Sequence, residues 1–425
     1  MLPITLFRNA EDKERVLTGL KKKQVKNLEI VDEIIALDEE KRQVQQVSES
    51  LTASMNQAAK SIGALMAQGK KEEAEEAKKE VSAQKAEAAE LQTKLALLEK
   101  ALDDKLVSLP NLPHSTVPEG KTPEENEVVR SGGSIAELAD DALPHWELTS
   151  KYDIIDFELG NKITGSGFPV YKGKGARLQR GLVQYFLDFN TAAGFLEIQP
   201  PLLVNEASAY GTGQLPDKEG QMYHSTVDNF FLIPTSEVPV TNIYRDEILK
   251  LEQLPAKFTA FTPCFRREAG SYGKDVRGLN RLHQFDKVEI VQLVKPEGSY
   301  EVLDEMVAHV EKLIQSLELP YRILRLCGGD MGFTSALTYD FEVYSAAQKR
   351  WLEVSSVSNF ENYQTNRMKI RYRNEEGKVE LLHSLNGSSL ALPRIMACLI
   401  ENNQTAEGIR LPEVLRNYIP FEFIN

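Results

Sequence analysis

The sequence has few cysteines and no long apolar run, and each scarcity excludes a class of protein. Its three cysteines, Cys264, Cys327 and Cys398, are widely separated and form no Cys-x-x-Cys pair. A structural zinc site built mainly from cysteines is therefore not expected, and the sparse, odd count fits a reducing cytosol. No apolar run approaches the roughly 20 residues of a spanning helix, and residues 1–16 lack the pattern of a signal peptide. We expect a cytoplasmic protein that does not contact a membrane.

The chain also lacks an excess of positive charge. Its 50 Lys and Arg residues face 63 Asp and Glu residues, which gives a formal net charge of −13. This balance argues against a protein that coats nucleic acid through net charge alone. It leaves room for a local RNA-binding surface, because phosphate contacts depend on local lysines and arginines. At 425 residues, of which 42% are hydrophobic, the chain can form two or three domains.

Two long segments place one stripe of residues at alternating steps of three and four. The first contains Ile30, Ile34, Leu37, Lys41, Val44, Ser48, Leu51, Met55, Ala58, Ile62 and Leu65. The second contains Ala74, Ala77, Val81, Gln84, Ala88, Leu91, Leu95, Leu98 and Leu102. This spacing predicts two coiled-coil helices, each roughly 50 Å long. Gly69 between them can reverse the chain, so we expect an antiparallel hairpin.

The heptads alone leave two other interpretations open, a dimerisation zipper and a simple spacer. The interruption at Gly69 favours a self-contained hairpin over one continuous zipper. Residues 27–105 hold 11 Lys and Arg against 17 Asp and Glu, yet residues 50–71 contain Lys60, Lys70 and Lys71 and no acid. The pattern therefore indicates an acidic stalk with a cationic tip.

The composition changes after the hairpin. Residues 109–123 are rich in proline and turn-forming residues and predict a linker. Beyond them, apolar strand-like runs such as 230–233 and 288–291 alternate with helical stretches such as 176–190 and 300–317. This order predicts an α+β domain on a mostly antiparallel sheet flanked by helices. The expected division is an N-terminal domain over 1–108, a linker over 109–130 and a second domain over 131–425.

Residues 264–289 combine features that suit a phosphate-bearing ligand. Arginine offers a rigid fork of donors for phosphate or carboxylate, and glycines let a loop approach a ligand closely. Phe285 can stack on a purine. Each residue alone fits a surface ion pair or a core aromatic better than a ligand contact, so only the combination indicates binding. Its members are Arg266, Glu268, Gly270, Gly273, Gly278, Phe285 and Glu289.

This run closely resembles motif 2 of class II aminoacyl-tRNA synthetases in their seryl form, bacterial type, and the resemblance covers essentially the whole chain. After the antiparallel arm, matching segments follow in the family's order at 210–216, 235–237, 264–289, 353–356 and 386–388 with Arg394. Residues 194–201 resemble motif 1, which forms the dimer interface in the family and carries a key proline, here Pro201. The resemblance implies a homodimeric serine–tRNA ligase with an N-terminal tRNA-binding arm.

The resemblance also implies a site for ATP and Mg²⁺. Arg266 would hold the α-phosphate, Glu268 the adenine amino group and Arg281 the γ-phosphate side of a bent ATP. Phe285 and Arg394 would enclose the adenine ring, while Glu353 and Ser356 would hold Mg²⁺, which prefers oxygen ligands. The expected ATP-binding residues are Arg266, Arg267, Glu268, Arg281, Phe285, Glu353, Val354, Ser355, Ser356 and Arg394, with Arg266 and Arg394 as the catalytic pair.

A serine pocket is implied next to it. Carboxylates such as Glu237 and Glu289 can pair with the ammonium of a free amino acid, and a buried acceptor for its hydroxyl would reject alanine. The expected residues are Thr235, Ser236, Glu237, Glu289, Asn386 and Ser388. Such a reaction needs positioning and charge stabilisation rather than a protein nucleophile, which agrees with the absence of a recognisable Ser-His-Asp arrangement. His283 and His383 are as consistent with structural roles as with ligand contacts.

By the same resemblance, the arm lies along the long variable arm of tRNA(Ser) bound to the partner subunit, and tRNA(Sec) is a second substrate of many relatives. Two other interpretations are disfavoured: a truncated relative that loads carrier proteins, because the arm is present, and a non-catalytic regulator, because the ATP-binding residues are present. Threonyl or prolyl specificity and the archaeal zinc-dependent seryl form match the motifs less well. Arg267, Ser389 and Pro393 depart from common family residues without removing an expected ligand.

Overall fold

The computed structural model describes residues 1–217, 219–269 and 277–425, so Gly270 and Gly273 of the motif 2 run lie outside the described residues. The chain divides into two compact units, Met1–Pro110 and Asn111–Asn425. Within the described ranges, no helix is both long and apolar enough to cross a membrane.

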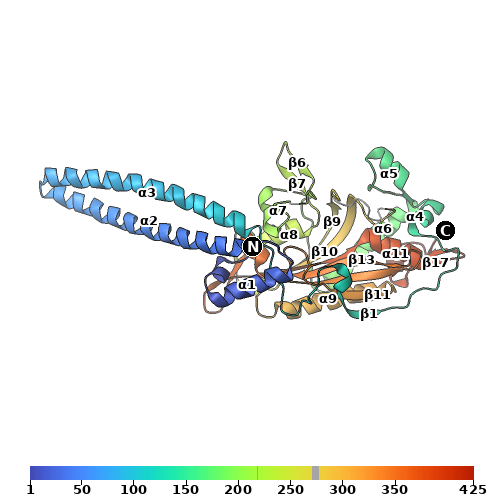
Figure 1. Ribbon diagram of the computed structural model, residues 1–425. Coiled ribbons are helices and arrows are strands. Elements are labelled where there is room, and N and C mark those ends of the chain that lie inside the picture. Colours follow the sequence, from blue (N-terminus) through green and yellow to red (C-terminus); the bar gives the residue numbers. More distant parts are fainter. Residues whose placement is uncertain (218, 270–276) are drawn as a thin grey trace. The chain divides into compact units, whose positions relative to one another are not determined.

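The first unit is helical. A short 3₁₀ helix, η1 (Ile4–Phe7), and α1 (Ala10–Lys22) precede the two long helices α2 (Ile30–Ala67) and α3 (Lys71–Leu106). Figure 1 shows α2 and α3 running antiparallel as one hairpin. The chain reverses at Gly69, whose φ of +76° is in the left-handed region that glycine adopts without steric cost. The predicted antiparallel hairpin is therefore confirmed.

The side-chain burial of this hairpin follows the predicted heptads. Between residues 41 and 97, the positions that are not fully exposed are the heptad positions listed above, while the residues between them face solvent. The two helices also contact each other through polar side chains, for example the ion pairs Lys41–Glu99 at 3.1 Å and Lys94–Glu40 at 2.8 Å. The stripe that the 3.5-residue period keeps on one side is thus the seam between α2 and α3.

The second unit is built on an eight-stranded sheet in the order β1-β11-β12-β13-β16-β10-β9-β4. All neighbouring pairs are antiparallel except β4 and β9, which are parallel. The strands are β1 (Glu127–Gly132), β4 (Leu196–Glu197), β9 (Ala256–Phe265), β10 (Gln284–Val294), β11 (Tyr321–Arg325), β12 (Leu337–Ser345), β13 (Arg350–Asn359) and β16 (His383–Ala391). The predicted α+β class with a mostly antiparallel sheet is confirmed.

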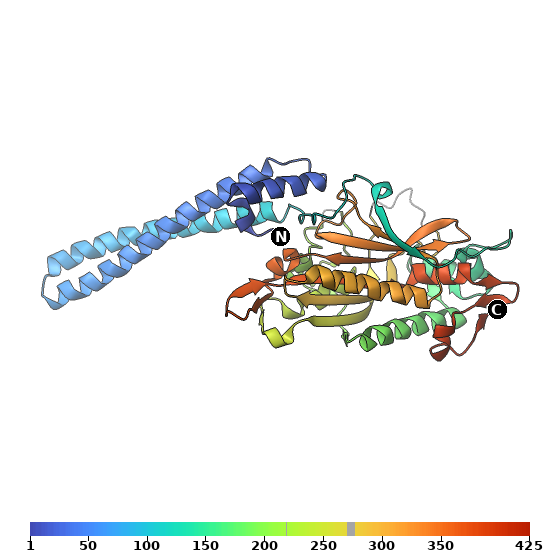
Figure 2. The ribbon, with the colours of Figure 1, turned by 90° about the horizontal axis from the view of Figure 1, so that it is seen from below.

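Three long helices share one hydrophobic core with this sheet. They are α6 (Gly173–Ala192), α9 (Ser299–Ser316) and α11 (Leu392–Asn402). Buried residues from all three, such as Phe186, Val310 and Ile395, belong to one cluster with Val288 and Ile290 of β10. Figure 2 shows α6 in green and α9 in orange along the same side of the sheet. The opposite side of β10 is left for the site described below.

Short elements complete the second unit. The helices are α4 (His145–Lys151), α5 (Phe157–Ile163), α7 (Glu206–Thr212), α8 (Glu237–Thr241) and α10 (Tyr363–Met368). One minor sheet pairs β2 (Ile155–Asp156) with β3 (Val170–Tyr171). Two more have three strands each, in the orders β5 (Leu203–Val204), β7 (Phe230–Leu232), β6 (His224–Ser225) and β15 (Val379–Leu381), β14 (Arg371–Arg373), β8 (Ile248–Leu249). The last has the order β17 (Gln404–Thr405), β18 (Gly408–Arg410), β19 (Phe423–Ile424).

The structure differs from the expected linker over 109–130. Residues from 111 onward fold with the second unit. The Asn111 side chain is buried and donates to the carbonyl oxygens of Thr334 and Phe360 at 2.9 and 2.8 Å, and residues 127–130 belong to β1, paired with β11. Proline and turn residues predicted an irregular path correctly. They carry no information about the distant carbonyls and strand edge that fix this path in place.

Candidate active site

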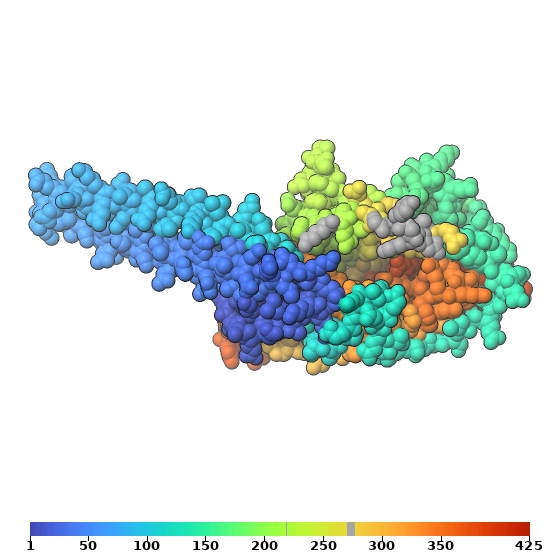
Figure 3. Space-filling model, in the orientation of Figure 1, coloured from blue at the N-terminus to red at the C-terminus, as the bar shows by residue number. Residues whose placement is uncertain are grey.

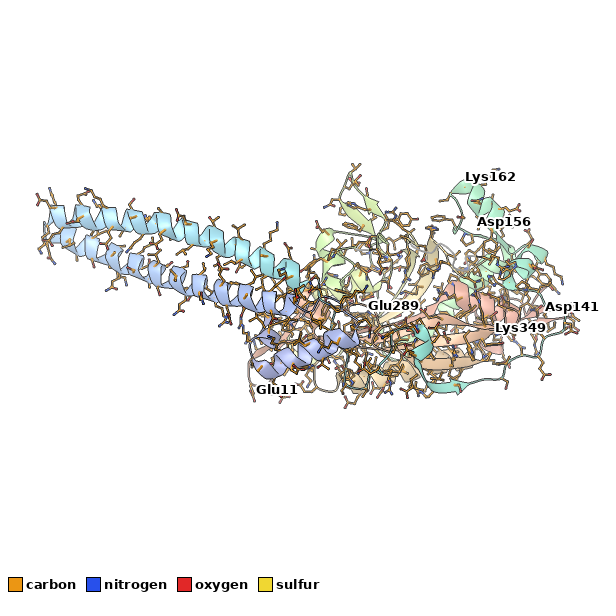
Figure 4. All side chains as sticks on the ribbon, in the orientation of Figure 1. Glu11, Asp141, Asp156, Lys162, Glu289 and Lys349 are labelled. Carbon is orange, nitrogen blue, oxygen red and sulfur yellow. The ribbon has the colours of Figure 1, made fainter. Side chains whose placement is uncertain are left out.

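A cavity of about 920 Å³ opens on the side of the sheet opposite α6, α9 and α11. Strands β10, β13 and β16 supply much of its wall, and the first turns of α8 and α11 supply Glu237 and Arg394. Figure 3 shows the surface hollowed between the yellow-green segment around residues 200–235 and the green segment near residue 160. Figure 4 places Glu289 in the middle of the unit.

The alternation of strand β10 explains which of its side chains reach the cavity. Phe285, Lys287 and Glu289 line it, whereas Val288 and Ile290 are buried in the core on the other face. Successive side chains of a strand point to opposite faces, so residues two apart share one face. The antiparallel register then places Ser388 of β16 directly across from Glu289.

The cavity brings together all the expected site residues except two. Its lining includes Thr235, Glu237, Arg266, Glu268, Arg281, Phe285, Glu289, Glu353, Val354, Ser355, Ser356, Asn386, Ser388 and Arg394. These residues come from segments up to about 160 positions apart, which only the sheet topology can unite.

Arg267 and Ser236 are the two exceptions. Arg267 is exposed and outside the lining, and its backbone N–H donates to the Gln221 carbonyl at 2.9 Å. In an extended segment the neighbour of an inward residue points outward, so the inward Arg266 turns Arg267 away. Ser236 is completely buried before α8, and its hydroxyl has no partner among the described residues. The structure therefore places these two residues outside the cavity lining, and their expected roles as direct ligands stay predictions.

One end of the cavity carries arginines. The Arg266 guanidinium lies over the Phe285 ring at 5.1 Å and its Nε donates to the Pro234 carbonyl at 3.4 Å. Arg281 forms an ion pair with Glu268. Arg394 donates to the Glu353 carbonyl at 2.7 Å and lies 3.5 Å from the Glu353 carboxylate. These partners hold three guanidinium groups at the cavity wall without burying them completely, which suits an anionic ligand.

The other end carries two carboxylates. Glu289 is 2% exposed, pairs with Lys287 at 2.5 Å, and accepts from the hydroxyls of Thr235 and Ser388 at 3.4 Å each. Glu237 accepts from Gln364 Nε2 at 2.7 Å. Burial, together with the charge of Glu289, raises the pKa of Glu237 to about 7. Lys287 thus faces both carboxylates but forms its ion pair with Glu289, so a cationic group of a ligand would balance the charge of Glu237.

Lys287 is a site residue that the sequence interpretation missed. It is 6% exposed and lies between Phe285 and Glu289 on the same face of β10. The two-residue period of the strand would have identified it, since Phe285 and Glu289 were both expected in the site. Gln364, which holds Glu237, lies 127 residues further along the chain and left no local signal.

His283 and His383, whose roles the sequence left undecided, both have partners within the protein. His283 contacts the Tyr223 hydroxyl through Nδ1 at 3.0 Å and stacks on Phe168 at 5.4 Å. His383 contacts the Ser299 hydroxyl through Nδ1 at 2.8 Å. Neither lines the cavity.

Both units match described families. Residues 1–113 match the seryl-tRNA synthetase N-terminal domain, and residues 222–403 match the tRNA synthetase class II core domain of the G, H, P, S and T enzymes. The serine–tRNA ligase of Salinibacter ruber is 49% identical over 423 residues, which is 99% of this chain and 98% of that protein. The serine–tRNA ligase of Methylacidiphilum infernorum is 45% identical over 426 residues, covering 100% of both chains.

Solved structures resemble the whole chain as well. The seryl-tRNA synthetase from Pyrococcus horikoshii complexed with ATP superposes with a TM-score of 0.92 at 32% identity, covering 100% of this chain and 99% of that one. The cytoplasmic serine–tRNA ligase from Naegleria fowleri in complex with AMP has a TM-score of 0.88 at 27% identity, with coverage of 100% and 99%.

Proposed function

Since the chain belongs to the seryl-tRNA synthetases, class II enzymes that join serine to tRNA, we propose that its 920 Å³ cavity binds ATP at the arginine end and serine at the carboxylate end. The chain is a serine–tRNA ligase. The observation that carries the assignment of the site is that one cavity is lined by three arginines, Arg266, Arg281 and Arg394, and also by two carboxylates, Glu237 and Glu289, that pair with none of these arginines.

The residues around the cavity suit both substrates. Arg266 would contact the α-phosphate of ATP, and Phe285 and Arg394 would enclose the adenine ring. Glu237 would pair with the serine ammonium, because its carboxylate lacks the lysine that Glu289 already has. Glu289 and Ser388 would receive the serine hydroxyl, and an analogue without that hydroxyl would leave them unpaired.

The chemistry follows from this placement. The serine carboxylate attacks the α-phosphate and releases pyrophosphate, and a ribose hydroxyl at the tRNA 3′ end then attacks the seryl carbonyl and releases AMP. The protein contributes orientation and stabilisation of the negative charge that develops at the α-phosphate, which we assign to Arg266 and Arg394.

Glu353 and Ser356 fit a Mg²⁺ that is shared with the nucleotide. Both offer oxygen atoms to the cavity, and the Glu353 side chain is 51% exposed there. No cluster of three or more metal-binding side chains occurs in the described part of the chain. Mg²⁺ is commonly held by one or two protein oxygens together with phosphates. When bound, the ion would neutralise phosphate charge.

We also propose that the α2–α3 hairpin binds tRNA(Ser) by shape. Its surface away from the seam is polar, and residues 50–71 at its tip carry Lys60, Lys70 and Lys71 without an acid. Such lysines can contact phosphates although the whole chain is acidic. Charging assays with tRNA(Ser) and tRNA(Sec) transcripts would measure both expected substrates. We propose a cytoplasmic location for this reaction.

A homodimer through the motif 1 region is a further part of the proposal. Leu196, Leu202 and Leu203 are 61%, 37% and 49% exposed, which is unusual for neighbouring leucines on a surface that faces only water. We expect Leu196→Asp to produce monomers in light scattering, because burying a carboxylate against a partner is unfavourable. Leu97→Asp is the matched control, since Leu97 is 65% exposed on α3. An unchanged dimer in the first variant would place the interface elsewhere.

The pKa of Glu237 predicts the pH dependence of serine binding. Because that pKa is raised to about 7, the carboxyl loses its charge as the pH falls from 8 to 6. The KM for serine should rise about tenfold over this range, because a neutral carboxyl cannot pair with the ammonium. Glu237→Gln should bind serine weakly at both pH values. A wild-type KM that stays constant would remove Glu237 from the ammonium site.

The test of the proposed function is ATP–pyrophosphate exchange with each of the twenty amino acids. Serine should support exchange at least about 100 times better than alanine, because the hydroxyl acceptors would be left unpaired. Exchange with another amino acid in preference to serine would overturn the assignment of the pocket.

A further inference from the structure

A fully buried carboxylate lies on α11 outside the cavity. Glu401 is 0% exposed, and its two carboxylate oxygens accept hydrogen bonds from four N–H and O–H groups. Its Oε1 receives the backbone N–H of His145 at 2.8 Å, His145 Nδ1 at 2.6 Å and Gln348 Nε2 at 2.9 Å, while the Ser345 hydroxyl donates to Oε2. Burial would raise the pKa of Glu401, but the hydrogen bonds from His145 and from the Ser345 hydroxyl lower it overall. An ionised carboxylate can only accept hydrogen bonds.

The first consequence concerns His145, which is also 0% exposed. Because Glu401 can only accept, Nδ1 of His145 carries the proton, and Nε2 is left as the acceptor for the backbone N–H of Leu279 at 2.8 Å. Gly278, the residue before Leu279, packs against the same His145 ring. A Cβ on Gly278, whose φ is +61°, would lie 2.1 Å from Nε2, so only glycine fits there.

The second consequence concerns Gln348. Its Nε2 donates to Glu401, so its Oε1 must accept, and it does so from Asn280 Nδ2 at 3.1 Å and from the Arg350 guanidinium at 2.9 Å. The Asn280 amide is therefore oriented, with Oδ1 as a buried acceptor that has no partner among the described residues. The Asn280 carbonyl also accepts from Arg394 Nε at 3.3 Å.

Both chains of hydrogen bonds end on consecutive residues of the cavity wall. Leu279 and Asn280 line the cavity and directly precede Arg281. We propose that Glu401, acting through His145 and Gln348, positions this stretch of wall for ATP, so that these three polar residues are positioning residues for the nucleotide. The inference rests on the proposed ATP site. The carboxylate end of the cavity has none of these residues as partners, so serine binding should be independent of them.

The test measures exchange kinetics of the full-length protein with His145→Asn and Gln348→Met. The asparagine is too short to reach Leu279, and the methionine keeps the size of Gln348 without its amide. Each variant should raise the KM for ATP about tenfold, as expected for losing one buried hydrogen bond. The KM for serine should stay within about twofold of wild type. His145→Gln, which can place an amide oxygen near Leu279, should recover most of the ATP affinity.

His309→Asn is the matched control. His309 contacts Asn190 Oδ1 through Nε2 at 2.8 Å but does not line the cavity. It should lower the melting temperature about as much as His145→Asn and leave the KM for ATP unchanged. If His145→Asn and Gln348→Met change both KM values equally, or neither, the positioning role is wrong. Should His145→Asn fail to fold, Gln348→Met alone decides. Wild-type exchange with serine tests the proposed function separately.

Discussion

Shortening the α2–α3 hairpin should abolish tRNA charging and leave amino acid activation intact. The contacts between α2 and α3 pair Ser54 with Gln84 and Lys41 with Glu99, so residues 47 and 91 face each other approximately. Replacing residues 48–90 with a short glycine linker would therefore keep the base of the hairpin, including the buried Ile34, Leu98 and Leu102. We expect serylation of tRNA(Ser) to fall at least about 100-fold, because an interface for RNA shape is removed. Exchange should stay within about threefold of wild type.

The hairpin tip offers a milder version of the same experiment. Replacing Lys60, Lys70 and Lys71 with glutamine should raise the KM for tRNA and make it less dependent on salt, because fewer counterions are released. Replacing Lys78, Lys85 and Lys100 along the acidic stalk is the matched control. Normal charging by the shortened protein, or loss of exchange together with charging, would contradict the division between arm and catalytic unit.

Arg266→Ala should eliminate serine-dependent exchange while the protein stays folded and dimeric. Arg266 is the lining residue with its guanidinium on Phe285, and we place it against the α-phosphate. Losing a charge-assisted donor at the centre where charge develops should lower kcat/KM at least about 1,000-fold. With the residues that the structure describes, its side chain makes one cation–π contact and one long hydrogen bond, so the cost in stability should be only about 1 kcal/mol.

Arg267→Ala is the control that the structure supplies. The two arginines are adjacent and chemically identical, but Arg267 is exposed and outside the cavity lining. Its removal should change exchange by less than about threefold, as expected for an exposed side chain. Equal losses in the two variants would show that the outward position of Arg267 does not persist in the working enzyme, and normal exchange by Arg266→Ala would remove Arg266 from the phosphate site.

The fold of the first unit could be predicted because its information is local. Coiled-coil packing depends on a 3.5-residue period and a turn, and both can be read from residues 30–102. The site residues could be named for a different reason. Their motifs resemble those of a family, and the resemblance supplied the roles of Arg266, Glu289 and Arg394. Composition and spacing alone favoured an ion pair or a core residue for each of them.

By itself, then, the sequence determined the hairpin and the α+β class, and its resemblance to a family named 14 of the 27 residues that line the cavity. Only the tertiary structure decided which way each side chain faces: Arg266 inward, Arg267 outward and Lys287 onto Glu289. It also decided which distant partners hold the wall, such as Glu401 through His145 and Leu279. The physical reason is that periodic patterns encode short-range geometry, whereas hydrogen bonds and charge pairs between remote segments exist only after the sheet has brought those segments together.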